Sequence, residues 1–185
     1  MLQLTDQGLI SGVPFLDSPN CEDRPEGSEV SLLVVHNISL PPGQFGSGDI
    51  TDFFLNRLDV ERHPYFHSIA GLRVSAHLLI DRQGAITQFV PFHRRAWHAG
   101  KSCYASRENC NDFSIGIELE GCDDLAYTDP QYQALAAVTR ALMARYPALT
   151  RERICGHSDI APGRKTDPGP AFSWDYFYAQ LDLLF

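Results

Sequence analysis

The chain has 185 residues, of which 44% are hydrophobic and 21% are charged, and its formal net charge is −8. These values are ordinary for one compact domain, and they exclude a long disordered tail. The negative charge offers no basic surface to a phosphate backbone, so we expect no nucleic-acid partner.

The N-terminal segment MLQLTDQGLISG has neither the basic start nor the apolar stretch of a secretory signal. No later run approaches the ~20 apolar residues of a membrane span. The five cysteines are odd in number and never form CxxC, which argues against a disulfide framework or a thiolate zinc site, so we interpret them as reduced thiols. We expect a cytoplasmic monomer without membrane contact.

Residues 1–30 contain three prolines among polar residues and show no sustained period of 2 or 3.6. We expect an irregular arm laid over a domain formed by residues 31–185. The first strong signal in that domain is the apolar, β-branched run Ser31–His36, which stops before a turn containing Pro41, Pro42 and Gly43. This pattern predicts a buried strand with His36 at its end.

Two further elements follow in the first half of the chain. Asp49–Leu58 has apolar residues at helical spacing behind a potential Asp49 cap, which predicts a helix. Ala76–Val90 contains two strand-like runs around a polar turn with a glycine, the pattern of a hairpin. The sheet should therefore include antiparallel pairing.

The second half supplies a strand and two helices. Phe113–Glu120 alternates, with four apolar residues on one face and Ser114, Gly116, Glu118 and Glu120 on the other. Asp129–Tyr146 carries a helical apolar stripe closed by a proline, and Trp174–Leu184 is amphipathic. Strands interleaved with helices predict an α/β domain built on a central mixed β-sheet flanked by helices.

The loop Gly156–Pro170 concentrates reactive side chains on a stiff backbone rich in proline and glycine. Imidazole nitrogen and carboxylate oxygen both bind zinc, and a catalytic zinc ion typically takes three protein ligands. His157 and Asp167 supply two such ligands, and His36 at a buried strand end is the third candidate. A single histidine of this kind is equally compatible with a satisfied core residue.

The other histidines are weaker candidates for metal ligands. His63 and His67 are four residues apart but are separated by a proline, so a solvated surface pair is favoured. His77 is expected to face the core. His93 and His98 flank two arginines and a tryptophan, which resembles a substrate wall more than a metal site.

Glu118 is the candidate general base, because a buried carboxylate near zinc can take a proton from an attacking water. It lies beside Gly116, whose missing side chain is expected to leave room for a substrate. Glu120 points to the same face of the strand and competes for the role of general base, but Glu118 lies deeper in the strand. Lys165 is the candidate cation for an oxyanion, although a lysine between polar neighbours is ordinarily a solvated charge. The set predicts metal-assisted hydrolysis of an amide.

Four segments of the sequence carry a family resemblance: LLVVHNISLPPGQFG (Leu32–Gly46), RAWHAG (Arg95–Gly100), CNDFSIGIELEG (Cys110–Gly121) and GHSDIAPGRKTDPGP (Gly156–Pro170). In this order they resemble the AmpD branch of the type 2 amidases, the cytoplasmic 1,6-anhydro-N-acetylmuramyl-L-alanine amidases of peptidoglycan recycling. The resemblance covers about residues 10–180. It implies the mixed-sheet fold shared with peptidoglycan recognition proteins, and a small anhydromuropeptide as substrate.

The resemblance also implies roles for individual residues. It assigns a Zn²⁺ ion to His36, His157 and Asp167, and catalysis to Glu118 and Lys165. For the substrate it points to Asn37, Arg73 and Trp97. Two positions depart from the family pattern. Asn109 replaces an arginine found in some relatives, so one carboxylate contact is either lost or replaced by Arg107 or Lys101. Ser158 stands where the family has cysteine.

Two other functions compete with this hypothesis. The same fold binds muropeptides without cutting them when the metal ligands are absent, but all of the expected ligands and the glutamate are present in this sequence. A secreted amidase or phage lysin would act on polymeric wall, and the missing export signal is only a partial argument against it.

Overall fold

The computed structural model describes residues 2–183, which form an α/β domain around a five-stranded sheet. In spatial order the strands are β4 (Ile86–Gln88), β3 (Leu78–Ile80), β8 (Ser114–Glu120), β2 (Leu32–Ile38) and β9 (Ile154–Gly156). The last four run parallel to one another, while β4 pairs with β3 in antiparallel fashion as the predicted hairpin. The predicted mixed sheet is therefore confirmed.

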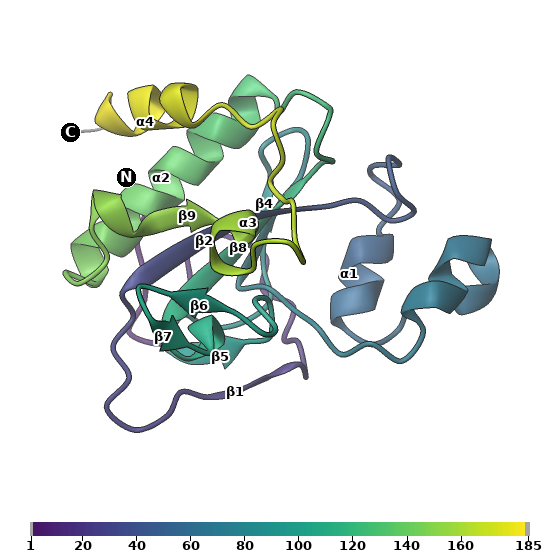
Figure 1. Cartoon of the computed structure of the whole chain (residues 1–185), viewed down its shortest axis with the longest axis horizontal. Coiled ribbons are helices and arrows are strands. Elements are labelled where there is room, and N and C mark those ends of the chain that lie inside the picture. Colours follow the sequence, from purple (N-terminus) through teal and green to yellow (C-terminus); the bar gives the residue numbers. More distant parts are fainter. Residues whose placement is uncertain (1, 184–185) are drawn as a thin grey trace.

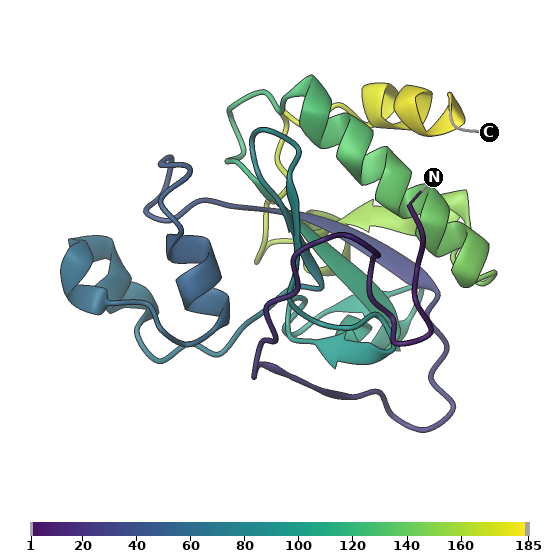
Figure 2. The same cartoon turned by 180° about the vertical axis from the view of Figure 1, so that it is seen from behind.

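Two helices cover one face of the sheet, α2 (Asp129–Arg145) and α4 (Trp174–Asp182), as Figures 1 and 2 show. Helix α2 begins at a capping box in which Thr128 and Gln131 satisfy each other's backbone N–H groups. Its apolar stripe packs on the face of the sheet that carries Val35 and Ile117. The C-terminal helix ends at Asp182, and the end predicted at Leu184 lies outside the described residues.

The opposite face of the sheet is covered by short elements and loops. These are β6 (Cys103–Tyr104), β7 (Arg107–Glu108), the 3-10 turn η3 (Cys110–Asp112) and α3 (His157–Ile160). Leu32 and Val34 of β2 pack against them, because alternate residues of a strand point to one face. His36 continues this series toward the end of β2, and it is buried. The functional face of the sheet is therefore the one turned away from α2.

One segment projects to the side of the sheet and is joined to it by two extended stretches (Figures 1 and 2). It contains α1 (Asp49–Phe54) and the 3-10 turns η1 (Val60–Arg62) and η2 (Pro64–Ile69). A second apolar cluster, which includes Phe54, Phe66 and Phe89, connects this segment to the edge of the sheet. The projection forms one wall of the cleft described below.

The N-terminal arm is fastened to the rest of the domain by regular pairing and by side-chain hydrogen bonds. Its strand β1 (Cys21–Asp23) pairs with β5 (Arg94–Ala96), and the Arg24 guanidinium donates to the carbonyl oxygens of Asn111, Phe92 and Ser114. A last 3-10 turn, η4 (Arg151–Arg153), precedes β9. Within residues 2–183 no helix has the length and apolar character needed to cross a membrane.

Candidate active site

Three side chains meet where β2 and β9 approach their carboxyl ends, the usual place for a site in a parallel sheet. His36 lies near the end of β2, and β9 stops at Gly156 so that His157 follows at once as the first residue of α3. His36 Nδ1 is 2.9 Å from His157 Nδ1, and each of these nitrogens is 3.0 Å from Asp167 Oδ2. Three ligand atoms from distant parts of the sequence thus converge on one point.

The loop that carries Asp167 is held against the sheet by a close approach at Gly156. A Cβ atom at Gly156 would lie 2.7 Å from Cδ of Pro168, so a side chain there would push the loop away. The Ser158 N–H donates to the Asp167 carbonyl at 3.0 Å, and the Tyr127 hydroxyl donates to the Pro168 carbonyl at 2.7 Å. These contacts explain the stiffness that was predicted for this loop.

The electrostatics of this group favour an anionic carboxylate beside neutral imidazole. Burial lowers the pKa of His36 to about 4. Burial alone would raise the pKa of Asp167, but its polar contacts with His157 and His36 outweigh this effect and hold that pKa well below its usual value. At neutral pH the Asp167 carboxylate is therefore anionic and the His36 imidazole is neutral.

Such a donor set fits a divalent metal ion of intermediate softness. Two imidazole nitrogens and one carboxylate oxygen are a typical ligand set for catalytic zinc, which is bound at about 2.0–2.1 Å with a fourth position left for water. Ligand atoms around a tetrahedral ion lie roughly 3.3 Å apart by this geometry, slightly more than the 2.9–3.0 Å separations found between His36, His157 and Asp167. All of these residues are buried, so an ion bound by them would be shielded from bulk water.

Glu118 lies next to His36 on the neighbouring strand β8, in register with it, so both side chains emerge on the functional face. Burial raises the pKa of Glu118 well above its usual value, the charge of Asp167 raises it further, and the positive charge of Lys165 opposes both. Within residues 2–183 its Oε2 is buried and has no hydrogen-bond partner. An unpaired buried carboxylate oxygen is costly, which indicates a functional role rather than a structural one.

Glu120, the competing carboxylate, accepts hydrogen bonds from the backbone. Its Oε1 accepts from the Gly46 N–H at 2.6 Å and its Oε2 from the Arg82 N–H at 3.3 Å. These bonds fasten the loop after β2 and the turn between β3 and β4. The structure therefore favours Glu118 as the free carboxylate of this strand.

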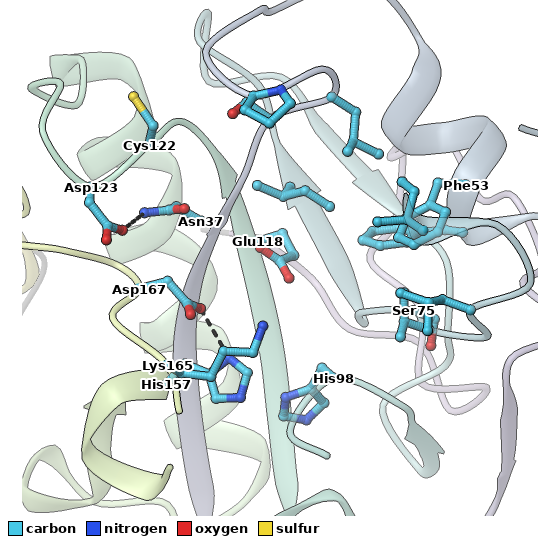
Figure 3. A pocket seen from close by; sticks show the side chains of 18 of the residues that line it. Asn37, Phe53, Ser75, His98, Glu118, Cys122, Asp123, His157, Lys165 and Asp167 are labelled. Atoms are coloured by element: carbon cyan, nitrogen blue, oxygen red, sulfur yellow. Dashed lines mark hydrogen bonds and ion pairs between the residues drawn. The ribbon is translucent and has the colours of Figure 1, made fainter. Parts of the chain in front are cut away.

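A cleft of about 530 Å³ opens beside these residues and is shown in Figure 3. One wall carries Glu118, His157, Lys165 and Asp167, and Figure 3 shows the Lys165 and Glu118 side chains directed into the space between the walls. The other wall is apolar and comes from the projecting segment, through Phe53, Phe54, Tyr65, Ile69 and Leu72. The cleft thus pairs a reactive wall with an apolar one.

Of the predicted substrate contacts, only Asn37 is among the residues that line this cleft. Its amide nitrogen donates to Asp123 Oδ1 at 2.8 Å and to the Pro168 carbonyl at 3.1 Å, so among residues 2–183 its oxygen is left as an acceptor. Asp123 was not singled out from the sequence, because nothing in its local pattern marks it as the partner of a residue 86 positions away. Asn37 is thereby held in one orientation (Figure 3).

The other predicted contacts lie outside the cleft lining. Arg73 borders a smaller neighbouring pocket, and Arg107 on β7 covers the Phe113 ring at 4.0 Å. The Trp97 indole N–H donates to Glu22 Oε1 at 3.2 Å. Their roles as substrate contacts stay predictions.

The remaining histidines separate into surface and buried groups. His63 and His67 lie on or beside the exposed turn η2, away from the metal-binding cluster. His77 is buried, as predicted. His93 is exposed beside Gly8 of the N-terminal arm and does not line the cleft, so the substrate-wall interpretation fails for this residue. His98 does line the cleft.

Gly116 has a different purpose from the one expected. The space beside it holds the His98 ring, because a Cβ atom at position 116 would lie 2.3 Å from Cγ of His98. The missing side chain therefore makes room for a buried histidine and not for a substrate. Sequence reasoning could not distinguish the two, since His98 is far along the chain from Gly116.

Gly116→Ala is expected to destabilise the protein by about 1–3 kcal/mol, as forced overpacking of a core usually does. The backbone there does not require glycine, so the loss would come from displacement of the His98 ring. Chemical denaturation measures the difference, with Gly163→Ala as a contrast, because position 163 has open space but a positive φ of 76°. Unchanged stability for Gly116→Ala would contradict the close approach.

Comparison with known proteins agrees with this architecture. The sequence profile of the N-acetylmuramoyl-L-alanine amidase family matches residues 26–170. The chain is 58% identical over 180 residues to the 1,6-anhydro-N-acetylmuramyl-L-alanine amidase AmpD of Salmonella typhimurium (strain SL1344), covering 97% of this chain and 96% of that protein.

Two solved structures extend the comparison. A crystal structure of a selenomethionine AmpD derivative superposes with a TM-score of 0.94 at 58% identity, covering 97% of this chain and 99% of that one. The amidase AmiD of E. coli, solved with the substrate anhydro-N-acetylmuramic acid-L-Ala-D-γ-Glu-L-Lys, superposes with a TM-score of 0.61 at 27% identity, covering 96% of this chain and 65% of that one. The fold and the enzyme class agree in both cases.

Proposed function

Because the chain belongs to the N-acetylmuramoyl-L-alanine amidase family, we propose that it is a zinc-dependent enzyme that cuts the amide bond between 1,6-anhydro-N-acetylmuramic acid and L-alanine in muropeptides. One observation carries the proposal: the convergence of His36, His157 and Asp167 beside the unpartnered carboxylate oxygen of Glu118. The high identity to AmpD over nearly the whole chain supports the anhydro sugar as the natural substrate.

The zinc ion would be held by Nδ1 of His36, Nδ1 of His157 and a carboxylate oxygen of Asp167, the atoms that converge in the structure. When bound, such an ion supplies a Lewis acid that lowers the pKa of a water molecule from 15.7 to about 7 and polarises a carbonyl group. The protein contributes fixed ligand positions and a buried surrounding, which strengthens both effects.

The reaction adds water to the lactyl carbonyl carbon and breaks its bond to the alanine nitrogen. Glu118 takes the proton from the attacking water and delivers it to the leaving amine, so one carboxylate serves both steps. Its raised pKa makes the carboxylate a stronger base toward the attacking water. Lys165 places a positive charge where the carbonyl oxygen becomes negative. The products are a free lactyl carboxylate and a free peptide amine.

The cleft is compatible with such a substrate. Its apolar wall, formed by residues such as Phe53 and Leu72, suits the apolar face of a sugar ring, and the Asn37 oxygen can accept from an amide N–H. We place the protein in cytoplasmic peptidoglycan recycling, which its five free thiols support because reduced cysteines persist in the cytosol. Fractionation against a cytoplasmic marker enzyme tests the location.

The competing functions are a lysin acting on polymeric wall and a binding module without catalysis. Incubating the purified protein with an anhydromuropeptide and, separately, with intact sacculi distinguishes all of them by mass spectrometry of the products. We expect release of free peptide from the small substrate and little from sacculi. Release from sacculi alone would support a lysin, and no cleavage of either substrate would support a binding module.

His157→Ala is expected to lose the bound metal, because two protein ligands hold a catalytic zinc ion far less tightly than three. Elemental analysis should find about one zinc per wild-type chain and much less in the folded variant. His67→Ala is the matched control, since this histidine is exposed on η2 and should keep full zinc content. Full zinc in folded His157→Ala would remove this residue from the site.

A further inference from the structure

His98 is buried between a proposed metal ligand and the strand β8. Its Nδ1 lies 2.9 Å from Nε2 of His36, and its Nε2 lies 3.0 Å from the Ser114 hydroxyl oxygen. The His36 and His98 rings meet edge to face, with centroids 5.0 Å apart. His98 lines the cleft, and Figure 3 shows its ring below Lys165 in that view. The side chains of His36, His98 and Ser114 therefore form a continuous series of polar contacts. The series begins at Nε2 of His36, whereas Nδ1 of His36 faces the proposed metal site.

The proton positions in His157 are set by a group that can only accept. His157 Nε2 lies 3.1 Å from the Ala99 carbonyl oxygen, while the donating Arg164 guanidinium nitrogen is farther away at 3.5 Å, so the closer contact favours a proton on Nε2. In a neutral imidazole the other nitrogen then has a free lone pair, which is the state that Nδ1 needs in order to bind a metal. A backbone carbonyl thus prepares His157 as a ligand.

His36 has no such carbonyl, because its Nε2 faces another imidazole. A neutral imidazole has one donor and one acceptor nitrogen, so the His36–His98 contact can hold its protons in two arrangements. In the first, His36 Nε2–H donates to His98 Nδ1, His98 Nε2–H donates to Ser114 Oγ, and His36 Nδ1 is free. In the second, every donor is reversed and His36 Nδ1 carries the proton, which blocks metal binding.

We propose that His98, backed by Ser114, is a positioning residue that accepts the His36 Nε2–H bond and so holds His36 in the tautomer and ring orientation that bind the metal ion. The inference rests on the proposed metal site. Gly116 contributes to this arrangement, because its missing side chain provides the space that the His98 ring occupies. Outer partners of metal ligands typically change metal affinity roughly 10- to 100-fold.

The tautomers can be read directly in the full-length protein. Long-range ¹⁵N–¹H correlation spectra of the zinc-loaded wild type, with His36→Gln and His98→Gln used to assign the signals, report which nitrogen of each ring carries the proton. We expect protons on Nε2 of both His36 and His98. A proton on His98 Nδ1 in the zinc-loaded protein would overturn the proposal, because His98 would then be a donor to His36.

Zinc affinity, measured by competition with a chromophoric chelator, provides the second readout. His98→Phe fills the space but cannot accept, so we expect a 10- to 100-fold weaker affinity; His98→Gln offers an amide oxygen and should recover part of the loss. His93→Gln is the control and should bind as the wild type does, because this exposed histidine lies on the other side of β5 from His98.

The outcomes separate this inference from the proposed function. If the wild type binds zinc and folded His98→Phe binds it equally well, the positioning role is wrong and the metal site stands. If the wild type binds no zinc, the metal site and the positioning role both fall. Circular dichroism and thermal melting establish that each variant is folded, and His98→Gln keeps the test valid should His98→Phe fail to fold.

Discussion

Glu118→Gln is expected to keep its zinc and its fold while turning over an anhydromuropeptide roughly 10²- to 10⁴-fold more slowly, the usual contribution of a general acid–base group. The amide has the size of the carboxylate but cannot take the proton from water. Because Glu118 Oε2 has no hydrogen-bond partner among residues 2–183, its replacement breaks no structural network. The measurements are kcat, zinc content and thermal stability.

Glu120→Gln is the matched control on the same face of the same strand. Its carboxylate accepts from the backbone N–H groups of Gly46 and Arg82, so we expect a loss of stability with little change in kcat. A near-normal kcat in Glu118→Gln, or the large loss appearing in Glu120→Gln instead, would assign the proton transfer to a different group.

The sheet was largely predictable because its strands carry strong local patterns. Ser114–Glu120 alternates, and its apolar side packs against α2 as the alternation requires. The strand predicted over Ser31–His36 instead spans Leu32–Ile38. Asn37 and Ile38 extend the ladder because Leu119 and Glu120 of β8 are available as partners, which the sequence around His36 does not reveal.

Helix α1 shows how tertiary contacts override a local pattern. Its apolar spacing predicts an end at Leu58, but the helix stops at Phe54. The Ser18 hydroxyl of the N-terminal arm donates to the Phe54 carbonyl at 2.6 Å, and Asn56 adopts a positive φ of 57°. A contact from a residue 36 positions earlier is invisible to a periodicity argument.

The expected cap of this helix was also wrong. Gly48 occupies the N-cap position, and the Asp49 carboxylate forms an ion pair with Arg62 Nη1 at 2.8 Å. Asp49 is already the first residue of the helix, so its carboxylate does not cap the helix and is available to a cation. The projecting segment brings that cation close, and its own fold was not predictable from the sequence.

The site was predictable to the extent that its residues stand in chemically unusual segments. His157 and Asp167 occur in a stiff loop with few apolar residues, and His36 ends an apolar run, so each drew attention by itself. The structure adds their convergence. His98 lines the cleft, in agreement with the substrate-wall interpretation, but its contacts with His36 and Ser114 depend on the fold and were not predictable. The contacts of Trp97 with Glu22 and of Arg107 with Phe113 likewise arise only in the folded chain.

Lys165→Ala is expected to lower kcat and kcat/KM by similar factors, on the order of 10²-fold or more, by analogy with the removal of an oxyanion donor. Lys165 lines the cleft, and within residues 2–183 its ammonium group has no ion-pair or hydrogen-bond partner, so its charge is available to a bound substrate. The oxyanion exists only after water has attacked, so the charge should stabilise the transition state more than the ground state.

A lysine that merely attracts an anionic peptide would behave differently. Its loss would raise KM, leave kcat nearly unchanged, and have an effect that fades as salt screens the attraction over a Debye length of about 8–10 Å. Measuring both constants at low and high ionic strength separates the two cases, with Lys165→Arg as the control that keeps the charge. We expect kcat to fall in Lys165→Ala at both salt concentrations and to recover in part in Lys165→Arg. An effect on KM alone would refute the catalytic role, because a group that stabilises only the oxyanion cannot act through ground-state binding.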